Sequence, residues 1–223
     1  MPPRIYAACL ASYNNGALHG VWIDADQDPE SITEKIRLML RESPYPTTTV
    51  RECTCYECNH VWQIPIDSYP RTYPECPDCG TLPRCLNISR PILTAEEWAF
   101  HDHEGWTFHD HEGWTPGEFE SIESVSRAGI LLEQHGEAFG LWLDYMTSGQ
   151  DPDEWGSDFE DSYLGKFAAK GDYAAQLLED TGAEVPEWLE YYIDRAAFER
   201  DMALNGDIHR VEHNGSIYVF DNC

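Results

Sequence analysis

The sequence is poor in basic residues. Its 223 residues include 14 Lys and Arg against 41 Asp and Glu, which gives a net charge of −27 with His neutral. Only Lys35, Lys166 and Lys170 are lysines. Because a protein that binds DNA directly needs a basic stripe to neutralise phosphates, this scarcity argues against direct DNA binding.

Long apolar runs are also missing. No stretch approaches the roughly 20 apolar residues that a membrane-spanning helix needs. The first residues, MPPRIYAACLASYNNG, have only a short apolar run before polar turn residues and lack the core of a signal peptide. We therefore expect a cytoplasmic protein.

Catalytic signatures are missing as well. The sequence contains no G-x-S-x-G, H-E-x-x-H or G-x-G-x-x-G motif and no phosphate-binding glycine loop. Carboxylates are so abundant that any two of them could be proposed as an acid–base pair. His209 and His213 fall in a predicted terminal hairpin, where surface positions are more typical. The sequence predicts no enzyme and no catalytic residue.

The excess of acid has three possible explanations: a solubility surface, adaptation to a high-salt cytoplasm, or imitation of a polyanion. Apolar residues at 42% and aromatic residues at 13% predict a folded chain rather than a disordered acidic tail. Duplex DNA carries one charge per ~1.7 Å of axis, so the net charge of this chain matches ~46 Å of duplex. The charge is sufficient for mimicry, but composition alone does not choose among the three.

Two strand-like segments open the sequence. Residues 4–11 (RIYAACLA) and 19–26 (HGVWIDAD) are rich in β-forming residues and flank an Asn-Asn-Gly turn, so they predict a hairpin with a long loop. Residues 98–100 (WAF) are a candidate third strand that rejoins this hairpin.

A helix is predicted after the hairpin and extends to about residue 41. Asp28 can cap it with Pro29 in the first helical position, whereas Ser31 has the capping-box spacing with Glu34, so two starts are possible. Its apolar face is predicted to consist of Ile32, Ile36, Met39 and Leu40.

The second half of the chain is predicted to be mainly helical. Residues 117–145 have helical periodicity with a break at Gly136, and further helices are expected at 160–181, with a break near Gly171, and at 186–205. The apolar residues of the first stretch are Ile130, Leu131, Phe139, Trp142 and Leu143.

The end of the chain is predicted to form a hairpin. Residues 207–212 and 216–220 flank an Asn-Gly turn, which is a strong hairpin signal. The fold class is therefore α+β, with small antiparallel sheets and helices in an elongated molecule. We expect three small domains: 1–115, interrupted by a cysteine-rich insert at 45–88, then an acidic helical domain at 116–160, and 161–223.

Six cysteines crowd the predicted insert. Cys55-x2-Cys58 and Cys76-x2-Cys79 are separated by seventeen residues, which is zinc-ribbon spacing. Four thiolates leave no open position on a tetrahedral ion, so the prediction is a structural Zn²⁺. A rubredoxin-like iron site is the chief alternative, and registers that include Cys53 or Cys85 are also possible.

An eight-residue sequence is repeated. FHDHEGWT at 100–107 recurs at 108–115. The histidines of the two copies could bind a metal, but we favour a slipped duplication, since eight residues cannot bury a core of their own. These histidines are His101, His103, His109 and His111.

Three segments in order resemble ArdA antirestriction proteins. They are YAACLASYNNGALHGVWIDA at 6–25, EEWAFHDHEG at 96–105, and EVPEWLEYYID at 184–194 followed by Ala197-Phe198 and Arg200-Asp201. With the terminal Asn-Gly hairpin, the resemblance covers most of 4–44 and 92–220. The insert and the second copy of the repeat depart from the family pattern.

The resemblance implies a non-enzymatic homodimer that mimics bent B-form DNA. Such proteins are carried by plasmids, phages and conjugative elements of bacteria and bind the methyltransferase core of type I restriction–modification enzymes in place of DNA. The acids expected on the mimic surface are Asp24, Asp26, Asp28, Glu30, Glu96, Glu97, Asp151, Asp153, Glu154, Asp158, Glu160 and Asp161.

The resemblance also implies where the dimer contacts lie. The segment at 184–194 resembles the region tied to dimer contacts in the family, and Val185, Trp188 and Tyr192 are its candidates, although core positions would suit them equally.

The alternative function is that of an acidic zinc-ribbon adaptor that binds a basic protein. The adaptor would need residues 45–88 for binding, whereas a DNA mimic would not.

Overall fold

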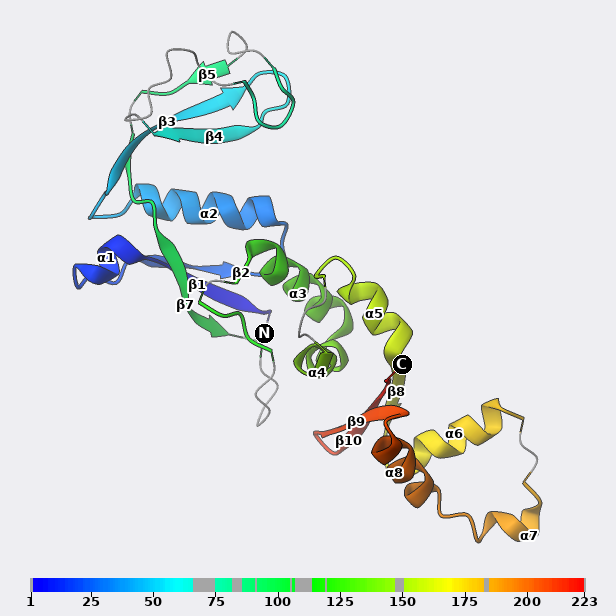
Figure 1. Ribbon diagram of the computed structural model, residues 1–223. Helices are drawn as coiled ribbons and strands as arrows, with labels where there is room; N and C mark the ends of the chain where they lie inside the picture. Colours follow the sequence, from blue (N-terminus) through cyan, green and yellow to red (C-terminus); the bar gives the residue numbers. More distant parts are fainter. Residues whose placement is uncertain are drawn as a thin grey trace. The chain divides into compact units, whose positions relative to one another are not determined.

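The computed structural model describes residues 2–65, 75–81, 86–90, 92–104, 106, 114–118, 120–146, 151–182 and 185–222 (Figure 1). The chain forms two compact units. Unit 1 comprises Met1–Gly105 with Pro116–Gly129, and unit 2 comprises Trp106–Thr115 with Ile130–Cys223. The three-domain division remains a prediction. Among the described residues, none of the helices has both the length and the apolar character that a bilayer span requires.

Unit 1 is built on a three-stranded antiparallel sheet in the order β2-β1-β7, with bounds β1 Arg4–Cys9, β2 Gly20–Asp24 and β7 Trp98–Glu104. The predicted hairpin and its third strand are therefore confirmed. The hairpin connection contains the short helix α1 (Leu10–Asn14), which the sequence did not predict.

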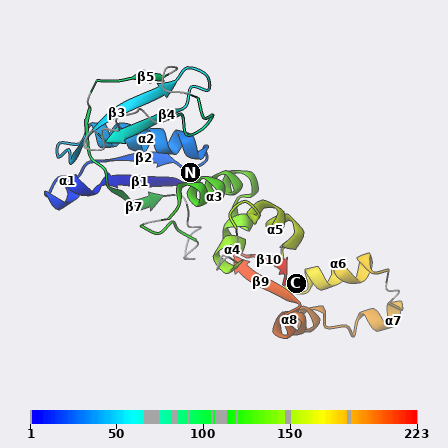
Figure 2. The same ribbon diagram turned by 45° about the horizontal axis from the view of Figure 1, so that its top comes forward.

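Helix α2 (Pro29–Arg41) packs on this sheet, and the four residues of its predicted apolar face are all buried. Of the two predicted starts, the structure has the one at Asp28. Its Oδ1 accepts a hydrogen bond from the Ser31 backbone N–H at 2.8 Å, which satisfies one of the free donors of the first turn. Figures 1 and 2 show α2 between this sheet and a second one.

The second sheet of unit 1 belongs to the cysteine-rich insert. The central strand β3 (Thr48–Cys55) pairs with β4 (Val61–Pro65) on one side, and on the other with β6 (Ile92–Thr94) near its start and β5 (Leu86–Ile88) at its end. At the base, the Ala95 N–H donates to the Leu40 carbonyl at 3.2 Å, which joins the insert to the end of α2. The α+β class with a zinc-ribbon-like insert is confirmed.

Helix α3 (Ile122–His135) begins against the junction of β2 and α2. A Cβ on Gly129 would lie 2.5 Å from the Ala25 backbone, so only glycine permits this approach. The Ser126 hydroxyl donates to the Gln27 carbonyl at 2.6 Å. These contacts hold the acidic turn between β2 and α2 in place.

The helices α4 (Glu137–Met146) and α5 (Trp155–Ser162) of unit 2 pack against each other through aromatic side chains. Helix α4 follows α3 after the break at Gly136, which the sequence predicted and where φ is +61°. Helix α5 packs Phe159 against Phe139 at 5.5 Å and Trp142 at 5.8 Å between ring centroids. Of the five apolar residues predicted for this stretch, all but the half-buried Ile130 are buried.

The rest of unit 2 is an antiparallel sheet in the order β8-β10-β9 with helices packed on it. The helix predicted at 160–181 is wrong before its predicted break near Gly171, since α5 ends at Ser162 and the chain continues as β8 (Tyr163–Phe167). After the break, the prediction is confirmed by α6 (Asp172–Asp180). Residues 163–167 pair with β10 (Ser216–Asp221), a partner distant in sequence that overrides the local helical pattern.

The predicted helix at 186–205 is also wrong as one element. It consists of α7 (Glu187–Glu190) and α8 (Arg195–Asn205), because Asp194 caps a new helix by accepting from the Ala197 N–H at 2.9 Å. The terminal hairpin of β9 (Ile208–His213) and β10 is confirmed. Its turn has φ of 50° at Asn214 and 73° at Gly215, the positive values of a type I′ turn.

Candidate metal centre and acidic surface

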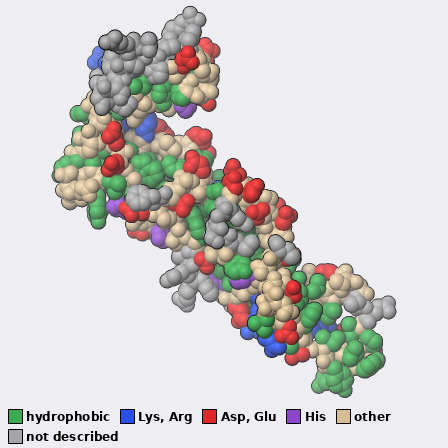
Figure 3. Space-filling model, in the orientation of Figure 1, with side chains coloured by type: hydrophobic (Ala, Val, Ile, Leu, Met, Phe, Trp, Pro, Cys, Tyr) green, Lys and Arg blue, Asp and Glu red, His purple; other side chains and the backbone are tan. Residues whose placement is uncertain are grey.

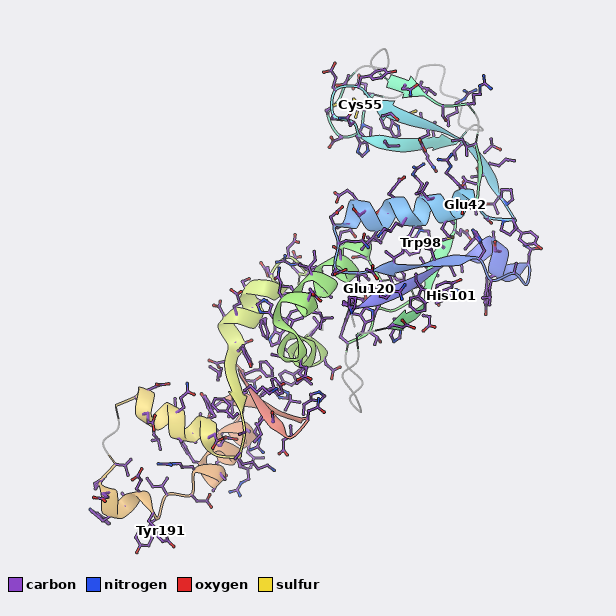
Figure 4. The ribbon with its side chains drawn as sticks, turned by 180° about the vertical axis from the view of Figure 1, so that it is seen from behind. Glu42, Cys55, Trp98, His101, Glu120 and Tyr191 are labelled. Carbon is purple, nitrogen blue, oxygen red and sulfur yellow. The ribbon has the colours of Figure 1, made fainter. Side chains whose placement is uncertain are left out.

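The four cysteines that the sequence singled out meet at the end of the insert. Cys55 ends β3, Cys58 lies in the turn after it, and Cys76 and Cys79 lie in a second turn (Figure 4, where Cys55 is labelled). All four sulfur atoms lie within 4.8 Å of one another. The Sγ atoms of Cys55 and Cys79 are 3.6 Å apart, as are those of Cys58 and Cys76.

The two turns have the same backbone hydrogen bonds. In the first, the Cys55 N–H donates to the His60 carbonyl at 2.9 Å and the Asn59 N–H to the Cys55 carbonyl at 3.0 Å. In the second, the Cys76 N–H donates to Thr81 and the Gly80 N–H to Cys76, both at 2.9 Å. Asn59 and Gly80 occupy equivalent positions with φ of 61° and 68°. The chain thus holds both thiol pairs by one repeated local structure.

The spacing of the thiols fits one metal ion. A tetrahedral ion with metal–sulfur bonds of ~2.3 Å requires sulfur atoms ~3.8 Å apart, close to the distances found here. A disulfide would need ~2.05 Å instead. The Thr81 hydroxyl lies 3.0 Å from Cys79 Sγ, and this contact lowers the pKa of the Cys79 thiol to about 6, favouring the thiolate that binds metals.

The structure also decides which cysteines belong to the centre. Cys53 lies two residues before Cys55 but is outside the group, fully buried, and burial raises the pKa of its thiol. Cys85 lies outside the described residues, as do His109 and His111. In the part of the chain that the structure describes, the four cysteines are the one group with metal-ligand geometry, and His101 instead packs edge-on against Tyr13.

An ionic network connects the insert to α2. Glu52 on β3 forms ion pairs with Arg37 and Arg41 of α2. Arg37 also donates two hydrogen bonds of 2.6 Å to Glu34, and these raise the pKa of the guanidinium. Arg37 and Glu52 are only 19% and 21% exposed, so this network is more than a surface contact.

The acids predicted on unit 1 lie on its surface. Two of them have local partners: Asp24 forms an ion pair of 3.1 Å with Arg4, and Asp28 caps α2, where the Ser31 hydroxyl lowers the pKa of its carboxyl. The remaining four have no Lys or Arg within ion-pair distance among the described residues. All six are exposed: Asp24, Asp26, Asp28, Glu30, Glu96 and Glu97.

The acids predicted on unit 2 gather on and just before α5. Trp155 and Phe159 face the core, so the opposite side of α5 carries the carboxylates, and Figure 3 shows acidic side chains gathered over this helix. Glu160 lies 3.9 Å from the His135 ring. Five of the six are exposed and Asp158 is half-buried; the set is Asp151, Asp153, Glu154, Asp158, Glu160 and Asp161.

The predicted dimer segment exposes several large apolar side chains of unit 2. Helix α7 has no buried residue; Trp188 is 73% exposed and Tyr192 75%, while Val185 is half-buried. Tyr191, which the sequence-based prediction omitted, is 90% exposed and is labelled in Figure 4. Two pairs of large apolar residues on either side of Glu190, Trp188-Leu189 and Tyr191-Tyr192, could have indicated it. A core position is ruled out for Trp188 and Tyr192 within this chain.

Fold and site together define an acidic α+β protein with a four-cysteine centre in a zinc-ribbon-like insert and carboxylates spread over both units. The family model for the antirestriction protein ArdA matches residues 5–216. The chain belongs to this family, which confirms the resemblance and implies an antirestriction function. No curated protein matches the chain.

Proposed function

We propose that this protein inhibits type I restriction–modification enzymes by occupying their DNA-binding groove as a DNA mimic. The proposal refines the antirestriction function of the family. The observation that carries it is the exposure of carboxylates without cationic partners. In the described chain, Asp26, Glu96, Glu97 and Asp161 are all exposed, and none lies within 4.0 Å of a Lys or Arg nitrogen. Such charges are available to a partner.

The charge density of α5 supports the proposal. Four acids lie between residues 154 and 161. At ~1.5 Å of rise per helical residue they span ~10.5 Å, an average spacing of ~3.5 Å between consecutive charges. This spacing is close to the ~3.4 Å per charge of a single DNA strand.

The mechanism is competition rather than catalysis. Lys and Arg side chains of the methyltransferase core, which otherwise bind phosphates, would pair with the carboxylates of this chain. Complementary charge would also accelerate the encounter, and salt would weaken the exposed pairs. Because the target acts on cellular DNA, the proposed place of action is the cytoplasm of the bacterial host.

We propose that the protein acts as a homodimer through α7. Exposed aromatic residues on α7 and directly after it favour burial against a partner, and aromatic residues dominate the binding energy of many interfaces. The residues proposed for the contact are Val185, Trp188, Tyr191 and Tyr192.

We propose that the metal is Zn²⁺ with a structural role. Four cysteine ligands in a closed tetrahedron are typical of structural zinc, and they leave no position for a reactant. Cys55, Cys58, Cys76 and Cys79 would hold the ion and stabilise the turns of an insert whose own core is small.

A competition assay tests the central proposal. A purified type I restriction–modification enzyme on fluorescent target DNA is titrated with the protein at two salt concentrations. Displacement of the DNA near stoichiometry, weaker at the higher salt, is the expected result. Absence of displacement from several such enzymes would contradict DNA mimicry. Displacement that is lost when residues 45–88 are deleted would favour the zinc-ribbon adaptor instead.

A further inference from the structure

The segment that carries α7 leaves and rejoins unit 2 at one place, which we call the neck (Gly171, Arg195, Glu199 and Arg210). Gly171 is the N-cap of α6, with φ of 92°, and Arg195 is the first residue of α8. A Cβ on Gly171 would lie 2.8 Å from the Ala196 backbone nitrogen, so the starts of the two helices are in direct contact. The α6–α7 segment is therefore a loop closed at the neck.

Glu199 lies at the centre of the neck and is 1% exposed. Its Oε2 accepts a hydrogen bond from the Gly171 N–H at 2.8 Å, and its Oε1 pairs with Arg210 Nη1 at 3.1 Å. One carboxylate thereby joins α6, α8 and β9. Burial of a charge is costly unless it is both paired and hydrogen-bonded, and this carboxylate has both kinds of partner.

Among the described residues, helix α7 makes few contacts with the rest of unit 2. It spans four residues, none of them buried, and so short a helix does not hold itself in water. Its Glu190 pairs with Arg195 at 3.1 Å, which connects α7 directly to the neck. In Figure 1, α7 lies at the far end of the chain segment between α6 and α8. The position of its exposed aromatic residues therefore depends on the neck.

We propose that Glu199 is a positioning residue for the α7 partner surface: it keeps the loop closed so that Trp188, Tyr191 and Tyr192 are presented in one arrangement. This inference rests on the proposed dimer. Glu199 itself, being buried in the chain, does not touch the partner. A monomer with an open neck must close it before binding, so the apparent dimer Kd rises as the fraction of closed monomers falls.

Two double variants isolate the neck hydrogen bond. Glu199→Gln with Arg210→Met removes the charge pair but keeps an acceptor for the Gly171 N–H. Glu199→Leu with Arg210→Met removes the pair and the acceptor together. Replacing a whole buried pair usually preserves folding, whereas removing one partner does not, so both variants should fold. Asp201→Asn is the matched control, since Asp201 lies on the same helix but pairs with Arg200 at the surface.

The measurements are hydrogen exchange of the amides in residues 185–193 at a dilution that favours monomer, and the dimer Kd by sedimentation. One hydrogen bond corresponds to roughly a 2- to 13-fold change in an equilibrium. We expect the Leu variant to exchange faster in this segment and to dimerise more weakly by that factor than the Gln variant, with Asp201→Asn unchanged. Equal exchange and equal dimer Kd in the two double variants would overturn the inference.

The dimer proposal is tested separately by Trp188→Ala. A weaker dimer supports α7 as the interface. An unchanged dimer overturns the proposed interface and with it the partner role of Glu199, while the exchange of residues 185–193 still reports whether the neck is closed.

Discussion

Neutralising the acidic side of α5 should weaken inhibition strongly without unfolding the protein. The variant replaces Glu154 and Asp158 with Gln and Asn, and Asp161 with Asn. Glu154 is the N-cap of α5, and Asp158 and Asp161 follow it at spacings of four and three, so the three lie along one side of the helix, with Asp158 half-buried. Their removal changes the charged surface and leaves the buried contacts of α5 intact.

The expected size of the effect follows from the exposure of Glu154 and Asp161 and the partial exposure of Asp158. If each carboxylate meets one partially desolvated cation, each pair contributes about 0.5–1 kcal/mol. Three pairs then contribute about 1.5–3 kcal/mol, which corresponds to roughly 13- to 160-fold weaker binding. The loss of acids near the start of α5 costs the helix only about 0.3–1 kcal/mol for each.

The assay is displacement of fluorescent target DNA from a type I restriction–modification enzyme at two salt concentrations. The control variant, Glu179→Gln with Asp180→Asn and Asp207→Asn, makes the same change in net charge at exposed positions of unit 2 away from α5. We expect the control to inhibit almost as well as the original protein, and the α5 variant to have lost part of its salt dependence.

Two results would refute this reasoning. Equal inhibition by the α5 variant and the original protein would show that these carboxylates are not bound by the enzyme. Equal weakening by the α5 and control variants would show that net charge, rather than its position on α5, governs inhibition.

Three further predictions concern the metal centre, the dimer and pH. Cys58→Ser should abolish binding of one Zn²⁺ per chain and increase hydrogen exchange in β3 and β4. Cys53→Ser changes a cysteine outside the four-cysteine group and should retain the metal. Loss of metal from both variants would contradict the assigned ligands. Trp188→Ala with Tyr192→Ala should raise the dimer Kd at least ~30-fold in sedimentation with little change in Tm, since both side chains are exposed; an unchanged Kd would place the interface elsewhere. Burial lowers the pKa of His209 from its ordinary 6.5, so as the pH falls the unfolded chain binds the proton before the folded chain does. The stability that neutral His209 contributes to the fold is therefore present above pH 6.5 and is lost as the pH falls through the lower pKa of the folded state. His209→Phe should therefore flatten the acid limb of a urea-unfolding profile against pH, and an unchanged limb would show that other groups cause it.

The features predicted best from the sequence depend on residues close together in the chain. Asp28 and Pro29 marked the start of α2, Asn214 and Gly215 marked the terminal turn, and Gly136 marked the break between α3 and α4. The metal centre belongs to the same group, because each C-x2-C pair is held by hydrogen bonds within its own turn. In these places the local chemistry suffices, since caps and turns need few distant contacts.

The sequence-based predictions were wrong where contacts with residues distant in the chain outweigh a local secondary-structure preference. Residues 163–167 were expected to be helical but form β8, because β10 offers them hydrogen bonds from fifty or more residues away. The acidic positions were chosen through resemblance to a family, and the sequence could not show which of them have cations nearby. Asp24, for example, pairs with Arg4 across neighbouring strands.

The sequence by itself therefore determined the acidic character, the α+β class, the four cysteines of the candidate metal centre and the ends of several elements. Only the tertiary structure decided that Trp188 and Tyr192 are exposed, that Cys53 is excluded from the metal centre, and that Glu199 is buried between Gly171 and Arg210. Glu199 is one of 41 acids in the sequence and has no local signal that distinguishes it. Its burial results from the packing of α6, α8 and β9, because burial is a property of the assembled fold and not of neighbouring residues in the chain.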